Sequence, residues 1–419
     1  MIWRTLYSLA LYAILPLHLA KTWWRGRNEP GYRMHVGERL GHYRDAVERP
    51  ILWVHAVSVG EARASAALVH ALALDHPEYE LLVTCTTAAG RDTLKALHGE
   101  SVRVAWLPYD LPGAVRRFLE HFRPRLGVLV ETEVWPNLLA ACRGFGVPVL
   151  LANARMSEKS ARGYGRWRGL ARPAFASLAA ACAQSEEDSK RLGGLGVSRT
   201  LISGNMKFDT APDEAKRAEG RAWRERLGRP VLLLASTREG EEAMLLGALP
   251  PWDGNLLVVI VPRHPRRFDE VAVLAQSRRS RGELPGREDR VHLGDTMGEM
   301  DFYFATADVA VIGGSFAPHG GQNLIEACAG GVPVVLGPHM FNFAEASRLA
   351  VEAGAAVQTA DAPSALREAL RLLADPAARA AMAAAGRKLC EGHRGATRRH
   401  LDICRQMLGE GSARAATRG

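Results

Sequence analysis

Short apolar runs recur along the first half of the chain and alternate with stretches of helical character. They occupy Ile51–Val57, Leu81–Cys85, Val102–Leu107, Leu126–Val130, Val147–Ala152 and Leu201–Ser203. These runs are continuous rather than alternating in polarity, which is typical of parallel strands buried on both faces. Helix-like stretches such as Glu61–Leu74 and Gly113–Phe122 lie between them. The pattern therefore predicts βαβ units and a parallel sheet, which is an α/β fold.

The pattern stops at a polar, charge-rich stretch from about Asp209 to Arg229 and then restarts. The later apolar runs are Val231–Ala235, Leu256–Val261, Val291–Leu293, Val309–Ile312, Val332–Leu336 and Ala355–Val357. A chain of 419 residues is long for one hydrophobic core. We therefore expect two doubly wound domains, 23–215 and 216–419, that face a cleft at the carboxyl ends of their strands. The final helical region is predicted over Pro376–Leu408.

The N-terminal segment differs from both halves. Leu6–Ala20 is almost wholly apolar, but it contains Pro16 and is shorter than the roughly 20 apolar residues of a full membrane span. A basic cluster with two tryptophans, KTWWRGR (21–27), follows at once, as in a belt on the cytoplasmic side of a membrane. A cleaved signal peptide would need a small-x-small cleavage site, which is missing after the apolar core. We expect residues 1–22 to be an uncleaved anchor helix that makes a short span or lies in the interface.

Composition indicates which classes of binding partner to expect. The formal net charge of +9 favours anionic partners. No zinc finger, aromatic-rich RNA signature or long basic tail indicates nucleic acid, so we expect an anionic membrane surface and anionic substrates instead. The six cysteines show neither zinc-finger nor CxxC spacing, and the histidines show no H-E-x-x-H pattern. We therefore expect reduced thiols and no metal site.

A glycine-rich stretch, ADVAVIGGSFAPHGGQNLIEACAGGVPVVLGPHMFNF (307–343), carries the clearest sign of ligand binding. Glycines between two apolar runs lead into Asn323–Ala329, which can begin a helix whose free N–H groups suit a phosphate. Glu326 would then lie in the first helical turn, where its carboxylate could accept hydrogen bonds from a ribose. The pattern is neither a Walker A loop nor a dinucleotide fingerprint. It favours a nucleotide-sugar site over an ordinary strand–helix connection.

Two groups of carboxylates follow predicted strands in the first half. HAVSVGE (55–61) predicts a strand, a turn and a helix start, so that Glu61 could take a proton from an acceptor hydroxyl at the strand's carboxyl end. Ser58 and Glu61 also fit a capping box, in which a glutamate needs no catalytic role, and both interpretations stay open. Glu131 and Glu133 follow Leu126–Val130 and could bind a metal, support acid–base chemistry or form structural salt bridges.

Polar residues follow several other predicted strands. Asn153–Ser157 and Ser203–Asp209 are expected to face a ligand, and Lys207 could contact an anionic sugar or be a surface lysine. Ser236–Glu242 begins a helix and offers a second geometry suited to an anion. Arg263 could meet a phosphate or carboxylate as a bidentate fork, or form a salt bridge to a neighbouring side chain.

With these blocks in order, the chain closely resembles the 3-deoxy-D-manno-octulosonic acid (Kdo) transferase family of lipopolysaccharide synthesis. The resemblance covers nearly the whole chain. It rests on the N-terminal segment and on HAVSVGE, ETEVWPN, NARMSEKS, SGNMKFD, ASTREGEE, VPRHPRR, DTMGEM, GGSFAPHGGQNLIEA and GPHMFNF. It implies the GT-B fold, with two Rossmann-like domains around a cleft.

The resemblance also implies a reaction. Members move Kdo from CMP-Kdo onto a lipid A precursor (lipid IVA) at the cytoplasmic face of the inner membrane. They invert the anomeric centre and use neither a metal at the site nor a cofactor.

The family's site residues fall on positions of this chain. The family's catalytic base falls on Glu61, and its transition-state-stabilising positions fall on Glu131 and Lys207. The contacts to CMP fall on Pro262, Arg263, Met297, Gly298, Glu299, Asn323, Leu324, Ile325 and Glu326. Leu324 and Ile325 depart slightly from the family, where Pro-Leu or Ile-Leu is common.

Three alternatives stay open at this point. Nucleotide-sugar 2-epimerases share the two-domain architecture, but they need no membrane anchor. A membrane-bound scaffold could keep the fold without the reaction, although Glu61, Lys207, Arg263 and Glu326 are all present. A glycosyltransferase that uses a UDP-sugar on a lipid carrier is the remaining alternative among enzymes.

Overall fold

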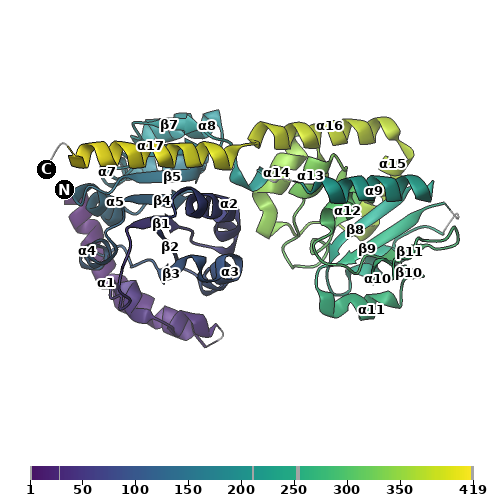
Figure 1. The fold of residues 1–419 in the computed structure, drawn as a ribbon, viewed down its shortest axis with the longest axis horizontal. Helices are drawn as coiled ribbons and strands as arrows, with labels where there is room; N and C mark the ends of the chain where they lie inside the picture. Colours follow the sequence, from purple (N-terminus) through teal and green to yellow (C-terminus); the bar gives the residue numbers. More distant parts are fainter. Residues whose placement is uncertain (1, 28, 210–211, 252–254, 417–419) are drawn as a thin grey trace. The chain divides into compact units, whose positions relative to one another are not determined.

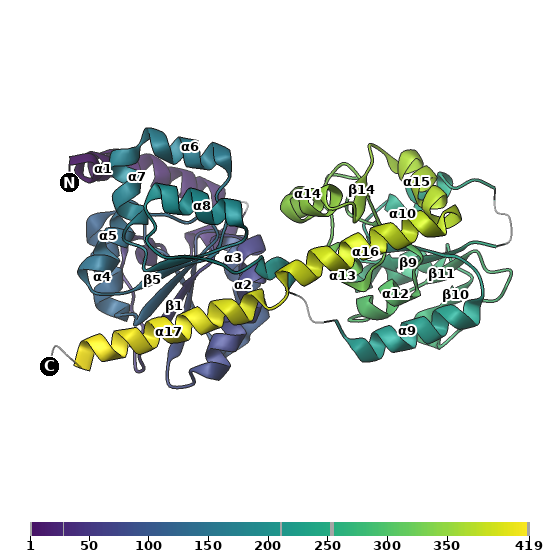
Figure 2. The same cartoon turned by 90° about the horizontal axis from the view of Figure 1, so that it is seen from above.

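The computed structural model describes residues 2–27, 29–209, 212–251 and 255–416. The chain forms two compact units (Figures 1 and 2), and each is described by itself. The first comprises Met1–Met206 and Gly395–Gly419, and the second comprises Lys207–Arg394. This differs from the expected domains 23–215 and 216–419, because the second unit begins earlier and the last helix returns to the first unit.

The first unit is built on a seven-stranded parallel sheet in the order β3-β2-β1-β4-β5-β6-β7. Its strands are β1 (Ile51–His55), β2 (Glu80–Cys85), β3 (Arg103–Trp106), β4 (Leu126–Val130), β5 (Val149–Ala154), β6 (Ala180–Ala183) and β7 (Thr200–Ile202). The order reverses between β1 and β4, which pair directly, with Val54 opposite Val128. The expected doubly wound sheet is confirmed, and β6 is a strand that the apolar pattern did not predict.

Helices cover both faces of this sheet. One face packs against α2 (Val59–Asp75), α3 (Ala88–His98) and α17 (Ala396–Ala416). The other packs against α4 (Pro112–Phe122), α5 (Pro136–Gly144), α7 (Arg168–Phe175) and α8 (Glu186–Leu195), and α6 (Glu158–Arg166) adjoins α7 and α8. Both faces of the strands are therefore buried, as the continuous apolar runs predict.

Helix α1 (Ile2–Arg25) lies against this unit through its polar and aromatic side chains. The Ser8 hydroxyl is hydrogen-bonded to the side chain of Asn137 on α5, and the Trp3 ring meets Trp167 edge-on. No residue of α1 is fully buried. Among the described residues, no helix combines the length and the apolar character needed to cross a bilayer. The short span that was one form of the expected anchor over residues 1–22 is therefore not supported.

The second unit repeats the plan with another seven-stranded parallel sheet, in the order β10-β11-β9-β8-β12-β13-β14. Its strands are β8 (Val231–Thr237), β9 (Leu257–Pro262), β10 (Ser277–Arg278), β11 (Val291–Leu293), β12 (Val309–Ile312), β13 (Val334–Leu336) and β14 (Ala356–Gln358). Here the order reverses between β8 and β12. All but the two-residue β10 follow the predicted apolar runs.

Helices again lie on both faces. One face packs against α9 (Glu214–Leu227), α12 (Met300–Thr306), α13 (Ile325–Gly330), α14 (Ala344–Glu352) and α16 (Pro376–His393). The other packs against α10 (Glu241–Gly247), α11 (Phe268–Ala272) and α15 (Ala362–Ala374). Short 3-10 turns connect elements in both units, at Pro30–Arg33, Val36–Leu40, Gly99–Ser101, Met206–Phe208, Pro265–Arg267, Arg279–Arg281 and Phe341–Phe343.

The predicted helical region Pro376–Leu408 is two helices rather than one. Gly395 has a positive φ of 74°, a conformation that favours glycine, and it separates α16 from α17. Beyond this break α17 lies on the first unit (Figure 1), where Cys404 and Met407 are buried in its core. Arg405 also forms an ion pair with Asp75 at the end of α2. Apolar periodicity alone does not show that a helix leaves one core for another.

Candidate active site

The first candidate base lies where the sheet order of the first unit reverses. β1 ends at His55, and Ser58 caps α2 by accepting the N–H of Glu61 at 3.4 Å. The Glu61 carboxylate accepts the N–H of Val57 at 2.6 Å and the Ser58 hydroxyl at 3.0 Å. Only one half of the capping box forms, because the carboxylate takes the N–H of Val57 rather than that of Ser58. These contacts nevertheless fix the carboxylate beside the carboxyl end of β1.

The capping contacts do not keep Glu61 strongly acidic. Burial raises the pKa of Glu61 to about 7, and the negative charge of Glu131 adds to the rise. The hydrogen bonds from Val57 and Ser58 offset only part of it. A carboxyl group with a pKa near neutrality can exchange a proton readily at the pH of a cell. The structural and the catalytic interpretations of Glu61 are thus compatible.

Two more carboxylates follow β4, the strand next to β1. Glu131 has a positive φ of 66°, and its N–H donates to Ala152 on β5. Burial raises the pKa of Glu133, while a hydrogen bond with Trp135 lowers it. Because β1 and β4 are neighbours at the switch point, the charges of Glu131 and Glu133 act on Glu61. In the described part of the chain, no group of three or more His, Cys, Asp and Glu side chains could hold a metal ion.

Asn153 at the end of β5 has a structural role, whereas the sequence pattern predicted a contact with a ligand. It is fully buried with a positive φ of 50°, and its N–H donates to Nε2 of His400 on α17 at 2.8 Å. Its Oδ1 accepts the N–H of Met206 at 3.0 Å. The Asn153 side chain therefore holds the segment before Lys207. A polar residue at a strand end gives the same sequence pattern whether it holds backbone or contacts a ligand.

Lys207 is the first residue of the second unit. Its ammonium lies 3.5 Å from a carboxylate oxygen of Glu345 on α14, and the lysine side chain is one-quarter exposed. The cation is thus accessible, and Glu345 orients it.

In the second unit, Glu241 is a structural brace that holds backbone groups. Its buried carboxylate accepts the N–H groups of Arg238, Gly314 and Phe316 at 2.9, 2.6 and 2.9 Å. These groups come from the ends of β8 and β12, where the sheet order reverses. Within Ser236–Glu242 the chain's own carboxylate therefore takes the N–H of Arg238, and an anion site at the start of α10 stays a prediction.

The two arginines after β9 have different surroundings. Arg267 is buried in a bidentate pair with Glu242, at 2.7 and 3.0 Å. Arg263 follows Pro262 at the end of β9, its N–H donates to Thr237, and its side chain is partly exposed. The VPRHPRR block therefore supplies one structural arginine and one accessible arginine.

The glycine-rich stretch ends in a polar pair at the start of α13. Asn323 donates to the Glu326 carboxylate at 2.8 Å and accepts the N–H of Ile325 at 3.0 Å, while Leu324 is buried. Burial raises the pKa of Glu326, and Asn323 and then Arg263 counteract the rise. Arg263 thus acts electrostatically on Glu326, so the predicted nucleotide residues do gather at one edge of the sheet.

The loop Met297–Glu299 would have passed as an ordinary polar loop without the family resemblance. Arg279 donates to both oxygens of Glu299, and Lys216 donates to the carbonyl of Gly298 at 2.6 Å. Burial raises the pKa of Glu299, but the hydrogen bonds from Arg279 and Thr296 and the positive charges of Arg279 and Lys216 outweigh it, so the pKa is lowered. Met297 stays exposed. The loop is therefore fixed by these contacts and remains accessible. No periodicity or residue spacing in the sequence predicts a ligand contact there.

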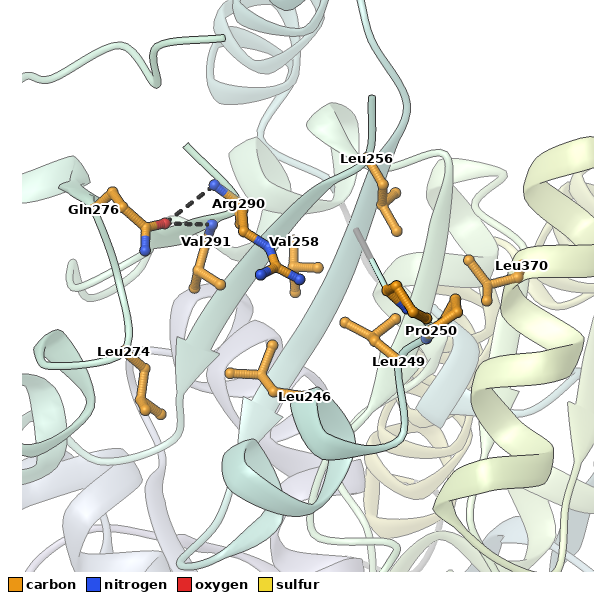
Figure 3. A pocket seen from close by; sticks show the side chains of 11 residues that line it. Leu246, Leu249, Pro250, Leu256, Val258, Leu274, Gln276, Arg290, Val291 and Leu370 are labelled. Carbon is orange, nitrogen blue, oxygen red and sulfur yellow. Dashed lines mark hydrogen bonds between the residues drawn. The ribbon is translucent and has the colours of Figure 1, made fainter. Parts of the chain in front are cut away.

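An apolar cavity of about 340 Å³ lies elsewhere in the second unit (Figure 3). Val258 and Val291, near the amino ends of β9 and β11, line it, whereas the nucleotide residues follow carboxyl ends. Leu246 and Leu274 point into the same space, and Gln276 accepts the N–H of Val291 at 2.9 Å. The cavity is therefore separate from the candidate nucleotide site.

Comparisons with known proteins identify the family of the chain. A family model described as 3-deoxy-D-manno-octulosonic-acid transferase (kdotransferase) matches residues 34–210. The 3-deoxy-D-manno-octulosonic acid transferase of Bordetella pertussis is 48% identical, covering 97% of this chain and all of that protein. Its counterpart from Haemophilus influenzae is 35% identical, covering 97% of this chain and 99% of that protein.

The solved structures show the fold. MurG of Acinetobacter baumannii is 13% identical and has a TM-score of 0.54, covering 85% of this chain and 99% of that one. The UDP-GlcNAc 2-epimerase of Neisseria meningitidis is 15% identical, with a TM-score of 0.51 and coverage of 86% and 100%. The expected GT-B type, with two Rossmann-like units, is thereby confirmed. The chain belongs to the 3-deoxy-D-manno-octulosonic acid transferase family and is a glycosyltransferase.

Proposed function

We propose that this protein transfers Kdo from CMP-Kdo to a lipid A precursor at the cytoplasmic face of the inner membrane, with inversion at the anomeric carbon. Glu61 is the general base. The observation that carries this proposal is the buried Glu61 carboxylate, whose pKa is raised to about 7. Family membership makes the reaction a Kdo transfer, and it favours transfer over the isomerisation of a nucleotide-sugar epimerase.

An inverting transfer in one step needs a group that removes the proton from the attacking hydroxyl. Glu61 is suited to this work because its pKa lies close to cellular pH. The negative charge of Glu131 helps to raise the pKa of Glu61, because it disfavours a second ionised carboxylate nearby. In this proposal the acceptor hydroxyl loses its proton to Glu61 as its oxygen attacks the anomeric carbon, and CMP leaves with the electron pair of the broken bond.

The donor is assigned to the second unit. Arg263 is the accessible cation for the phosphate of CMP, and Asn323 and Glu326 offer polar groups for the ribose. Met297–Glu299 and the neighbouring backbone complete the nucleotide contacts. Lys207 carries an oriented ammonium for the carboxylate of Kdo. A UDP-sugar remains the competing donor, and competition between CMP and UDP distinguishes the two.

We also propose that α1 lies in the membrane interface rather than across the bilayer. Its exposed large apolar side chains are Ile2, Trp3, Leu6, Leu9, Tyr12, Ile14, Leu17, Trp23 and Trp24. A helix with such a surface and a basic end can lie along a bilayer with anionic lipids. The phosphorylated acceptor would then reach the enzyme while its acyl chains stay in the membrane.

The test is to incubate the purified protein with CMP-Kdo and a tetra-acylated, bis-phosphorylated lipid A precursor and to weigh the lipid by mass spectrometry. We expect a mass gain of one or more Kdo units, and loss of that gain in Glu61→Gln. Glu120→Gln, on the exposed side of α4, is the matched control and should transfer normally. A folded, CMP-binding Glu61→Gln protein with normal transfer would remove Glu61 as the base. Unmodified lipid with intact donor and wild-type protein would refute the Kdo transfer itself.

A further inference from the structure

A basic cavity lies in the first unit, apart from the residues assigned to the reaction. It measures about 330 Å³ and lies between α6, α7 and α8. Its lining is Ala161, Tyr164, Gly165, Arg168, Ala171, Arg172, Arg191, Gly194 and Leu195. Three arginines and no carboxylate line it, so its charge is uniformly positive.

Small residues keep the cavity open between the arginines. A Cβ atom placed on Gly165 or Gly194 would meet nothing within 4 Å. On the α7 side, Arg168 and Arg172 are four residues apart and therefore share one face of the helix. Arg191 reaches the same cavity from α8. Arginines from two helices thus line a space large enough for a phosphate group.

The guanidinium groups of these arginines have N–H donors available for a ligand. Within the described residues, no hydrogen bond or ion pair engages the guanidinium groups of Arg168 and Arg172. Arg191 donates to the carbonyl of Met156 at 3.1 Å and lies 4.0 Å from Asp188. A guanidinium has five N–H donors, so this contact leaves several available. Over residues 158–172, five basic residues and one acidic residue give a formal charge of +4.

Exposed tryptophans lie next to the cavity. Trp167 is 63% exposed, and its ring lies edge-to-face with Trp3 of α1, which is 52% exposed, at 6.4 Å between centroids. The contact is close because Gly169 leaves room for the Trp3 indole. Tryptophan rings are typical of the headgroup level of a membrane. Trp167 directly precedes Arg168, so the tryptophan pair and one arginine of the cavity lie together at the start of α7.

We propose that this cavity binds the phosphate of an anionic phospholipid headgroup, with Arg168, Arg172 and Arg191 as its ligands. The inference rests on the proposed placement of α1 at a membrane surface. The guanidinium group of arginine can bind two phosphate oxygens at once. General attraction to a positive surface needs only charge and does not depend on this geometry. The site would set the orientation of the first unit on the bilayer, in addition to the apolar attachment of α1.

The experiment measures partition of the full-length protein between buffer and vesicles. Vesicles of phosphatidylcholine with phosphatidylglycerol are compared with vesicles of phosphatidylcholine alone. Arg168→Gln/Arg172→Gln should partition roughly thirtyfold less to the anionic vesicles, or about fivefold for each arginine, and bind the neutral vesicles as the wild type does. Arg221→Gln/Arg226→Gln, on the exposed face of α9, makes the same change in charge and should behave as the wild type. Both substituted pairs are exposed, and thermal unfolding verifies that each variant is folded.

Two further arms distinguish a site from general attraction. Arg168→Lys/Arg172→Lys keeps the charge but removes the forks, so partition to anionic vesicles should fall by about fivefold. Soluble glycerol phosphate should displace the wild type more than sodium chloride of equal ionic strength does. Unchanged binding of the lysine variant, or equal displacement by both solutes, would overturn the site while leaving α1 attachment and Kdo transfer intact. Absence of binding to every vesicle would overturn the membrane placement and the site together.

Discussion

Carboxylates at the switch points of the two sheets have opposite surroundings. In the first unit, burial raises the pKa of Glu61 to about 7, and the negative charges of Glu131 and Glu133 add to the rise. In the second unit, Glu241 is saturated by three N–H groups and Glu242 by a buried arginine. The same fold position can thus hold either a group poised to take a proton or a group that fixes the backbone. The number of donors facing the carboxylate decides which.

The largest expected effect comes from neutralising the poised carboxylate. Glu61→Gln should lower kcat/KM for Kdo transfer by about 10² to 10⁴, the usual contribution of a general base. The amide oxygen can still accept the N–H of Val57, so unfolding temperature should change little. Transfer is measured by mass spectrometry of the lipid, and CMP binding by calorimetry. Loss of CMP binding in this variant would mean that Glu61 acts through the donor and not as the base.

Removing the brace should damage stability first. Glu241→Ala leaves three N–H groups, two of them buried, without an acceptor, and we expect it to lower the free energy of unfolding by about 3 kcal/mol. CMP affinity should fall with it, because Gly314 and Phe316 lose their anchor. Chemical denaturation measures the first effect and calorimetry the second. Glu225→Ala on α9, which is exposed, is the control. Unchanged stability in Glu241→Ala would contradict the structural role.

A smaller change tests the coupling between the carboxylates. Glu61 must be ionised to act as a base, so the rate should rise with pH through about 7. Glu131→Gln removes a neighbouring negative charge, which lowers the pKa of Glu61 and moves the rising limb to lower pH. The pH dependence of kcat/KM measures this shift, with Glu120→Gln as the control. A limb that stays in place, or moves to higher pH, would refute the coupling.

The smallest effect is expected at the nucleotide loop. Arg279→Met removes the ion pair with Glu299 and keeps a side chain that can cover Phe302. Partly exposed pairs contribute about 1 kcal/mol or less, so CMP affinity should fall by at most about fivefold. Calorimetric titration with CMP measures it, and Arg281→Met, an exposed neighbour in the same turn, should leave affinity unchanged. A loss far beyond fivefold would mean that Arg279 contacts the nucleotide directly.

Much of the fold was predictable because parallel strands buried on both faces leave continuous apolar runs. The β6 strand, Ala180–Ala183, escaped because four small residues carry little β signal, and β10 has only two residues. The departure of α17 from the second unit escaped as well. Helical periodicity shows that a face is apolar, but it does not show which core the face joins.

The candidate site was predictable where a motif and a strand end coincide. Glu61 and Arg263 were found in this way, and each follows the carboxyl end of its strand. Glu326 lies in the first turn of α13, as the glycine-rich motif predicts. Asn153 was expected to face a ligand, although its Oδ1 holds a backbone N–H inside its own unit. Glu241 lies in a helix start that was expected to suit an anion, and its carboxylate also holds backbone N–H groups. A polar residue at a strand end has the same signature in both cases. The position of the nearest hydrogen-bond donor or acceptor distinguishes a structural role from a ligand contact. That position is known only from the three-dimensional structure.

The return of the last helix reverses the order in which the two units can be completed during synthesis. The second unit is one continuous segment, so all its residues have been made once Arg394 is added. The first unit still lacks Cys404 and Met407 from its core at that moment, and His400 has not yet met Asn153. Domains generally fold as units while the chain is being made. Here the unit that starts first finishes last, because its core and the contact between His400 and Asn153 are complete only after α17 has been made.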